Sequence, residues 1–325
     1  MKPTLALALA LVLTLGAVST ARAQDADTVG ARATAHRLAA RKIADVDFDG
    51  ALAMVCLPSP RPTGGPQVIP DKSTWYARPQ KVFDNLYWVG TKVHSSWALK
   101  TSAGIILIDT LFNYAVEPEI IDGLRSLGLD PASIRYVIIS HAHGDHDEGA
   151  ALLQSRYGAH VVLGAADWDL IAKSPNIKGG PPRRDVVAAD GGRITLGDTS
   201  VTLVATPGHT LGTLSAIFQV RDHGRPLNVA YSGGTALNFG PDAARDDLYI
   251  ASQRKMERAA RAAGATVLLS NHSQYDRAYE RAKLAQAPRA PGEAHPLEIG
   301  AEAVARYFQV TAECAQAARV EAGGQ

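Results

Sequence analysis

The feature that most constrains the fold is a series of short apolar runs that begins near residue 85. Apolar runs of four to eight residues between turn signals are typical of buried strands. The runs are NLYWVG, SWALKT, GIILID, YVIIS, HVVLG, VTLVAT, TLSAIF, LNVAYS and TVLLSN. Helical patterns lie between them, at Glu117 to Leu127, Glu148 to Tyr157, Tyr249 to Ala263, Tyr275 to Ala285 and Ile299 to Val320. This order predicts an α/β fold with two packed sheets between outer helices, a four-layer αββα sandwich.

The chain divides into three parts. Residues 1–23 have the pattern of a signal peptide, residues 24–80 form an N-terminal extension and a connector, and residues 81–325 form a catalytic domain. The extension contains a short helical pattern near Ala33 to Ala44, followed by the Pro/Gly-rich stretch LPSPRPTGGPQVIP. With 325 residues and 46% hydrophobic content, the chain can bury a large core.

The N-terminus predicts export from the cytoplasm. Lys2 supplies a positive charge, Leu5 to Leu15 an apolar core, and ARA a small-residue cleavage site, with cleavage expected after Ala23. The apolar core has about half of the ~20 residues that a spanning helix needs, so we expect no membrane span. The mature protein is therefore expected in the periplasm or outside the cell.

The charge balance bears on possible partners. The whole chain has 33 basic and 32 acidic residues, and removing residues 1–23 takes away Lys2 and Arg22, which leaves 31 against 32. Such a balance argues against a nucleic-acid partner and leaves a small-molecule substrate. The two cysteines, Cys56 and Cys314, would be in a compartment that permits disulfides, so a bridge and two buried thiols are both open.

A cluster of potential metal ligands follows the run YVIIS. His141, His143, Asp145 and His146 lie in the loop at the carboxyl end of this predicted strand, where functional residues gather. In an extended stretch His141 and His143 point the same way, and a turn at Gly144 would direct Asp145 and His146 to a neighbouring point. Imidazole and carboxylate groups suit Zn²⁺, although iron and manganese also accept this mixture.

Four residues cannot complete two metal sites, so further ligands are needed from distant segments. His209 in LVATPGHTLGT and His272 in VLLSNHSQYD each follow a predicted strand. The alternative reading of such residues is a polar loop. The remaining histidines are expected to be structural or at the surface: His36, His160, His223 and His295. His94, in GTKVHSSW, could border the site from an early loop.

Together these motifs resemble the metallo-β-lactamase superfamily. The segments DNLYWVGT, GIILIDT, SIRYVIISHAHGDH, GGRITLGD, ATPGHTLGTLS, VAYSGG and VLLSNH occur in the order expected for that superfamily, between about Leu86 and Arg319. The resemblance implies an αββα sandwich with two Zn²⁺ ions at its rim. It implies that His141, His143 and His209 hold the first ion and that Asp145, His146 and His272 hold the second.

One absence refines the resemblance. Members such as glyoxalase II and many phosphodiesterases bridge their metals with an aspartate after the strand that here reads LNVAYS, but this chain continues GGTALNFG. A three-histidine site beside an Asp-His-His site, with no bridging aspartate, resembles subclass B3 of the class B β-lactamases.

The chain also departs from that subclass. Serines that help to hold the substrate carboxylate are expected after the AY segment, whereas Gly233 and Gly234 stand there, and Thr235 or Asn238 could substitute for them. Cys314 lies in the matching final helix, but Ala265 stands about where its disulfide partner would be. The resemblance therefore leaves room for Cys56 as the partner.

The resemblance implies a zinc-dependent hydrolase that opens the amide of a β-lactam ring. A water shared by two zinc ions ionises near neutral pH and attacks the ring carbonyl, and Asp145 would be both ligand and orienter of the nucleophile. Ser140 and Thr210 are candidates for hydrogen bonds to the ligands, and His94, Trp97, Thr235 and Asn238 for the substrate pocket. A zinc hydrolase of the same fold acting on a lactone or another ester is the alternative, and a non-catalytic binding protein stapled by metal is a further one.

Overall fold

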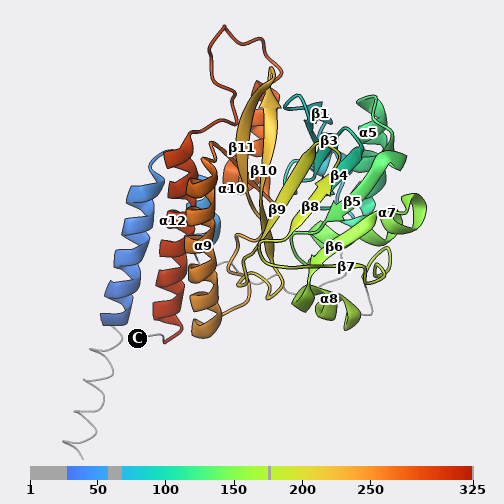
Figure 1. The fold of residues 1–325 in the computed structure, drawn as a ribbon. Helices are drawn as coiled ribbons and strands as arrows, with labels where there is room; N and C mark the ends of the chain where they lie inside the picture. The colour runs from blue at the N-terminus through green and yellow to red at the C-terminus, as the bar shows by residue number, and fades with distance from the viewer. Residues whose placement is uncertain (1–27, 58–67, 175–176, 324–325) are drawn as a thin grey trace, which may run out of the picture.

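The computed structural model describes residues 28–57, 68–174 and 177–323. The predicted signal peptide and residues 58–67 of the connector lie outside the described residues. Two sheets pack face to face, and helices cover the outer face of each, so the expected four-layer αββα sandwich is confirmed (Figure 1). Within the described residues, no helix is long and apolar enough to cross a membrane.

The first sheet has seven strands in sequence order. They are β1 Gln80–Lys81, β2 Leu86–Trp88, β3 Trp97–Thr101, β4 Gly104–Ile108, β5 Ile134–Ile138, β6 His160–Gly164 and β7 Val186–Ala188. Pairing is antiparallel from β1 to β4 and parallel from β4 to β7. The parallel half brings the carboxyl ends of β4 and β5 to the same edge.

The second sheet has five strands in the order β12-β11-β10-β9-β8. They are β8 Arg193–Leu196, β9 Thr199–Ala205, β10 Leu214–Asp222, β11 Arg225–Ser232 and β12 Val267–Ser270. Only the β11 to β12 pair is parallel. The nine strands expected from apolar runs are present, and β1, β7 and β8 were not among them.

Helices form the outer layers. Beside the first sheet lie α4 Asn113–Ala115, α5 Asp122–Ser126, α7 Ala150–Tyr157 and α8 Ala165–Ala172, with a π-helical segment at Val116–Ile121 and a 3-10 turn at Pro131–Ser133. The second sheet is covered chiefly by α9 Ala243–Ala263 and α12 Ala301–Glu321 (Figure 1). The short elements are α2 Asp49–Ala51, the π-helical turn Leu52–Cys56, α3 Lys72–Trp75, α6 Gly144–Asp147, α10 Ser273–Asp276 and α11 Ala278–Leu284.

Alternation along the strands explains the layers. In β4, Ile106 and Ile108 belong to the core between the two sheets, whereas Ile105 and Leu107 pack under the helices of the first sheet. In β11, Tyr231 faces the core between the sheets and Ala230 faces the α9 and α12 layer. Side chains alternate between the two faces of a strand, so strands that are apolar at every position serve both interfaces.

The N-terminal extension packs against the outer helices. Residues 28–44 are helical and lie beside α12, which makes this helix longer than the expected pattern near Ala33 to Ala44 (Figure 1). Phe48 stacks edge-on against Tyr307, with ring centroids 5.6 Å apart. A disulfide joins Cys56 at the end of the extension to Cys314 in α12. The extension is thus held to the domain by both apolar contacts and a covalent bond.

Removing this disulfide is expected to destabilise the protein. The bond spans 258 residues, so it restricts the unfolded chain, and we expect the Cys56→Ala and Cys314→Ala double variant to lose about 2–4 kcal/mol of unfolding free energy. Denaturant unfolding monitored by circular dichroism measures the loss. The parent protein kept in reductant is the control and should lose a similar amount. Identical midpoints for all samples would show that the bond contributes nothing to stability.

Candidate metal centre

The loop after β5 bends more sharply than an extended chain. The amide of His143 donates to the carbonyl of His141 at 3.0 Å, so the expectation of an extended stretch is wrong, although both rings still converge with centroids 4.7 Å apart. The helix α6 begins at Gly144 and presents Asp145 and His146 from its first turn. The loop therefore serves two neighbouring positions, as expected.

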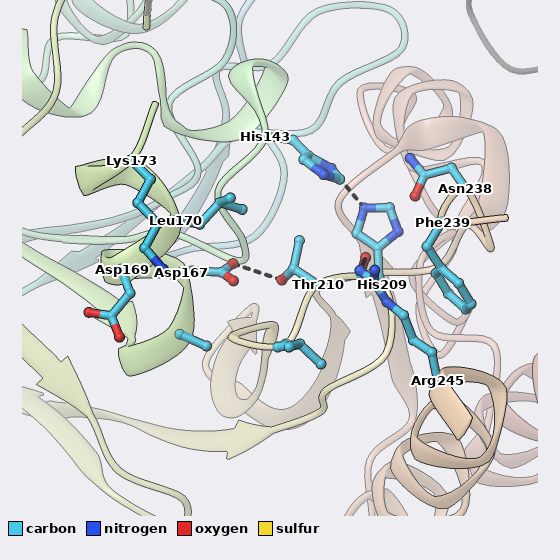
Figure 2. A pocket seen from close by; sticks show the side chains of 12 residues that line it. His143, Asp167, Asp169, Leu170, Lys173, His209, Thr210, Asn238, Phe239 and Arg245 are labelled. Atoms are coloured by element: carbon cyan, nitrogen blue, oxygen red, sulfur yellow. Dashed lines mark hydrogen bonds between the residues drawn. The ribbon is translucent and has the colours of Figure 1, made fainter. Parts of the chain in front are cut away.

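Three histidines converge at the first position. Nε2 of His209 lies 3.0 Å from Nε2 of His141 and 3.1 Å from Nδ1 of His143. Ligand atoms at 2.0–2.1 Å around a tetrahedral zinc ion are about 3.3 Å apart, so this spacing suits a metal. Figure 2 shows the rings of His143 and His209 pointing toward each other. The fold thus brings His141 and His143, from the loop after β5, to His209, from the loop between β9 and β10.

The second predicted set also converges. Oδ2 of Asp145 lies 3.2 Å from Nε2 of His146 and 3.2 Å from Nε2 of His272, and the two nitrogens are 3.2 Å apart. These three donor atoms form a triangle with the edge length that a tetrahedral metal requires. The two positions are adjacent, since donor atoms of His141, Asp145 and His146 lie within 4.8 Å of one another. The donor chemistry fits two Zn²⁺ ions.

Burial sets the protonation of the first position. It lowers the pKa of His143 to about 4 and that of His209 to about 3. Burial also lowers the pKa of His141 well below its usual value. All three imidazoles are therefore neutral at pH 7, and each has a lone pair to offer a metal.

The second position is charged. Burial alone would lower the pKa of His146, but the carboxylates of Asp145 and Asp109 outweigh it and raise this pKa to about 10. Burial opposes ionisation of Asp145, yet His146 and His272 bring its pKa well below the usual value. A metal ion bound here displaces the proton of His146, so binding at this position is coupled to pH.

Backbone carbonyls orient the first ligands. Nδ1 of His141 lies 2.8 Å from the carbonyl of Gly233, and Nδ1 of His209 lies 2.7 Å from the carbonyl of Ala236. A carbonyl can only accept, so the ring nitrogen beside it must carry the proton. This fixes the proton on Nδ1 and leaves Nε2 free for the metal. Ser140 also approaches His141, with Oγ 3.1 Å from Nδ1.

Asp109 is a residue that sequence reasoning missed. It follows β4 and is fully buried, with a φ of 62°. Its carboxylate accepts from the amide and hydroxyl of Ser140 at 2.7 and 2.9 Å, and from the hydroxyl of Tyr231 at 2.6 Å. Nδ1 of His146 lies 3.0 Å from Oδ2 of Asp109 but forms no hydrogen bond with it, so this contact is electrostatic. The available signal was its position directly after the predicted strand GIILI, at a strand end where functional residues gather.

Asp167 is a second missed residue. It lies in α8, and its carboxylate accepts from the amides of Ala142 and Gly212 at 2.8 and 2.9 Å and from the hydroxyl of Thr210 at 2.7 Å. It thus joins the loop that carries His141 to the loop that carries His209. The hydroxyl of Thr210 donates to Asp167 (Figure 2), and it also lies 2.8 Å from the hydroxyl of Thr213.

Two expectations for the pocket were wrong. Trp97 is fully buried in the core between the sheets, where its ring packs edge-on against Trp88 at 4.9 Å. Thr235 is buried among hydroxyls, with Oγ1 2.8 Å from the hydroxyl of Tyr307 and 3.2 Å from that of Ser270. An aromatic residue in an apolar strand is satisfied by packing, and a buried hydroxyl by internal partners.

A cavity of about 470 Å³ lies beside the first position. Asn238 lines it as expected, and Phe239 lies under the guanidinium of Arg245 at 4.4 Å. Figure 2 shows Arg245 and Lys173 on opposite sides of the cavity, with His143 and His209 between them. His94 lies elsewhere, beside Asp145, with Nε2 3.6 Å from Oδ2.

The glycines after β11 leave no room for side chains. A Cβ on Gly233 would lie 1.7 Å from the carbonyl oxygen of Leu214, and one on Gly234 would lie 2.7 Å from Cβ of His209. The serines expected from the resemblance therefore cannot stand here without a backbone shift. No carboxylate is present at this point either.

Comparison with known proteins agrees with this geometry. The sequence profile of the metallo-β-lactamase superfamily matches residues 89–223. The fold of the chain is that of the metallo-β-lactamase superfamily. Members of this superfamily are metal-dependent hydrolases, and the matched segment includes His141 to His209, hence most of the converging residues.

Solved structures similar to the chain include metallo-β-lactamases, of which BJP-1 is of subclass B3. The metallo-β-lactamase BJP-1 of Bradyrhizobium japonicum is 29% identical, and the match covers 72% of this chain and 91% of that one with a TM-score of 0.60. The Rm3 metallo-β-lactamase is 27% identical over 80% of this chain and 100% of that one, with a TM-score of 0.65. A metallo-β-lactamase of Cronobacter sakazakii is 26% identical over 74% and 93%, with a TM-score of 0.62.

Curated relatives carry another name. The hydroxyacylglutathione hydrolase of Acidiphilium cryptum is 37% identical over 83 residues, which are 26% of this chain and 30% of the relative. That of Cereibacter sphaeroides is 31% identical over 104 residues, 32% of this chain and 34% of the relative. The chain thus matches about a third of the length of these relatives.

Proposed function

We propose that the protein is a zinc-dependent hydrolase that opens the amide of β-lactam rings. The observation that carries this proposal is the pair of adjacent ligand sets, three histidines beside Asp145, His146 and His272, with glycines where a bridging carboxylate would stand. When bound, two zinc ions ionise a water near neutral pH and polarise the carbonyl that it attacks. The similarity to solved metallo-β-lactamases, including BJP-1 of subclass B3, supports the same substrate class.

The protein's own residues position the reaction. The carbonyls of Gly233 and Ala236 hold two imidazoles in the tautomer that turns Nε2 to the centre. Asp145 is the proposed orienter of the nucleophile, because its carboxylate belongs to the second set and lies within 4.8 Å of a ring nitrogen of His141 in the first set. Asn238, Arg245 and Lys173 offer polar contacts in the cavity beside His143. Two cations suit a substrate that carries a carboxylate.

Hydrolysis of a lactone, ester or thioester is the second candidate. The curated relatives named hydroxyacylglutathione hydrolases favour it, as do Gly233 and Gly234, which replace the expected substrate-binding serines. The missing bridging carboxylate favours the β-lactam candidate, because the resemblance expects an aspartate after β11 in enzymes of the glyoxalase II type. A non-catalytic, metal-stapled binding protein would need a closed site, whereas an open cavity adjoins His143 and His209.

The location proposed for this activity is the periplasm or the exterior of the cell. The disulfide between Cys56 and Cys314 supports an oxidising compartment. The signal peptide, whose cleavage we expect after Ala23, is the sequence feature that would direct the chain there.

The decisive experiment measures hydrolysis of a carbapenem and a chromogenic cephalosporin by the zinc-loaded mature protein. A chelated sample is the blank, and a lactone and a hydroxyacyl thioester are assayed in parallel. Chelator-sensitive opening of the β-lactam ring, faster than turnover of the other substrates, supports the proposal. Turnover confined to the lactone or thioester would replace it by the second candidate. Two bound zinc ions without turnover of any substrate would support the binding protein.

Lys173 gives a test of substrate recognition. It is exposed at the cavity rim, and we expect Lys173→Ala to raise KM for a carboxylate-bearing cephalosporin by up to about fivefold, because exposed ion pairs contribute about 0.2–1 kcal/mol. The effect should weaken in high salt. Lys100→Ala, at an exposed position of β3, is the matched control. Equal KM values for the two variants would exclude Lys173 from substrate binding.

A further inference from the structure

We propose that His94 is an additional protein ligand at the second metal position, beside Asp145 and His272. The inference rests on the proposed metal centre and extends it by one residue. His94 lies in the loop between β2 and β3, far in sequence from the other ligands. Its imidazole nitrogen, the carboxylate of Asp145 and the nitrogen of His272 lie within 4.8 Å of one another.

The backbone fixes His94 against the strand end that carries His272. The two residues form an isolated antiparallel bridge. On either side of it, the amide of Ser95 donates to the carbonyl of Asn271 at 2.9 Å, and the amide of Ser273 donates to the carbonyl of Val93 at 2.8 Å. These bonds hold the loop against the end of β12, so the backbone of His94 cannot move away from His272 without breaking them.

The side chain is held in one orientation. Thr91 Oγ1 accepts from the amide of His94 at 2.8 Å and lies 3.4 Å from Nδ1 of its ring. The ring of Phe112 packs edge-on against the imidazole, with centroids 5.1 Å apart. With Nδ1 on the side of Thr91, Nε2 faces the centre, and the side chain is only 18% exposed. In metal-binding histidines, one ring nitrogen typically has a hydrogen-bond partner and the other nitrogen binds the metal.

The distance to Asp145 favours coordination over a hydrogen bond. Nε2 of His94 lies 3.6 Å from Oδ2 of Asp145. Hydrogen bonds between nitrogen and oxygen are about 2.7–3.2 Å long, so this pair is too far apart for one. Two ligand atoms of one tetrahedral zinc ion are about 3.3 Å apart, and the observed separation exceeds this value by about 0.3 Å, a difference that a small rotation of the His94 ring could remove. A cation between the two atoms accounts for the arrangement better than a direct bond.

A fourth donor changes the character of the second position. With His94 added to Asp145 and His272, the second position would come closer to a closed site, whereas the three histidines of the first position would leave a coordination position open. The second position should bind zinc more tightly, and the open coordination position should belong to the set of His141, His143 and His209.

Zinc affinity provides the first test. Stepwise dissociation constants are measured for the mature protein by competition with a chromogenic chelator, and compared with those of His94→Ala and His94→Gln. Both variants should weaken one of two zinc sites at least about 100-fold and leave the other unchanged, since even indirect partners of a metal contribute 10–100-fold. His223→Ala is the matched control, because its side chain is 82% exposed in a turn remote from the ligands. Unchanged constants in both His94 variants would overturn the inference.

Cobalt substitution separates a ligand from a residue that acts through Asp145. Each histidine bound to Co²⁺ gives a shifted, solvent-exchangeable ring N–H signal in proton NMR. The five histidines of the proposed centre and His94 should give about six such signals. His94→Ala should lose one of them. Weaker zinc binding with no signal lost would make His94 a positioning residue and overturn the inference.

The outcomes also separate this inference from the proposed function. A parent protein that bound no zinc would overturn both. Two zinc ions bound with the same affinity in the parent and in His94→Ala would overturn the role of His94 alone.

Discussion

Replacing His143 by alanine is expected to remove one zinc equivalent and to lower kcat/KM by more than about 100-fold. The Nδ1 atom of His143 is one of three donors at the first position, and two remaining imidazoles cannot hold zinc in a three-ligand site. The reduction should exceed the 10–100-fold typical for loss of a residue that only supports a ligand. Metal analysis of dialysed protein and initial rates measure the two effects.

The stability of this variant should change little. His143 is only partly buried, and its removal relieves the crowding of three neutral imidazoles. The control is His223→Ala, which should retain both zinc ions and full activity. If His143→Ala kept two zinc ions and its hydrolysis rate, the assignment of the first position would be wrong.

The Asp109→Ala variant is expected to lose about 3–5 kcal/mol of unfolding free energy. Its removal leaves Ser140 and Tyr231 without their buried acceptor and His146 without the negative charge beside it, and breaking such a buried pair from one side has a cost of this size. Zinc at the second position should also bind about 10–100-fold more weakly, because His146 loses the group that orients it. Denaturant unfolding and chelator competition measure the two losses.

Two variants delimit this expectation. Tyr231→Phe removes a single donor to the same carboxylate and should cost about 1–3 kcal/mol. Asp198→Ala removes an exposed carboxylate that accepts from the amide of Ser102 at 3.0 Å, and should cost only about 0.5–1.5 kcal/mol of unfolding free energy. If Asp109→Ala were no less stable than Asp198→Ala, the contacts of Asp109 would be energetically neutral.

The sequence was sufficient for the layers of the fold, because long apolar strands carry a strong local signal. Apolar positions on both faces of β4 and β11 already indicate burial between a sheet and a helix layer. The missed strands β1, β7 and β8 contain two to four residues each. In β8 only Ile194 and Leu196 are apolar, so pairing with β9 defines this strand more than its own composition does.

The ligands were predictable for a similar reason. His141, His209 and His272 each follow a strand closely, so their places depend on local order and on which strand ends meet. The contacts that orient them could not be predicted, since Asp167 joins two loops that are about 70 residues apart in sequence and no pattern in α8 marks it. Trp97 and Thr235 were misplaced because an aromatic ring or a hydroxyl suits a core as well as a pocket.

The close approach at Gly233 limits how this protein could acquire new specificity through evolution. A side chain there would push on the carbonyl of Leu214, whose own amide donates to the carbonyl of Ser140 at 2.8 Å, immediately before His141. A single substitution on this wall of the centre would therefore displace a metal ligand together with the substrate. Mutational paths toward other substrates run through the residues that line the cavity, where Asn238, Phe239 and Lys173 can vary while the ligands stay in place.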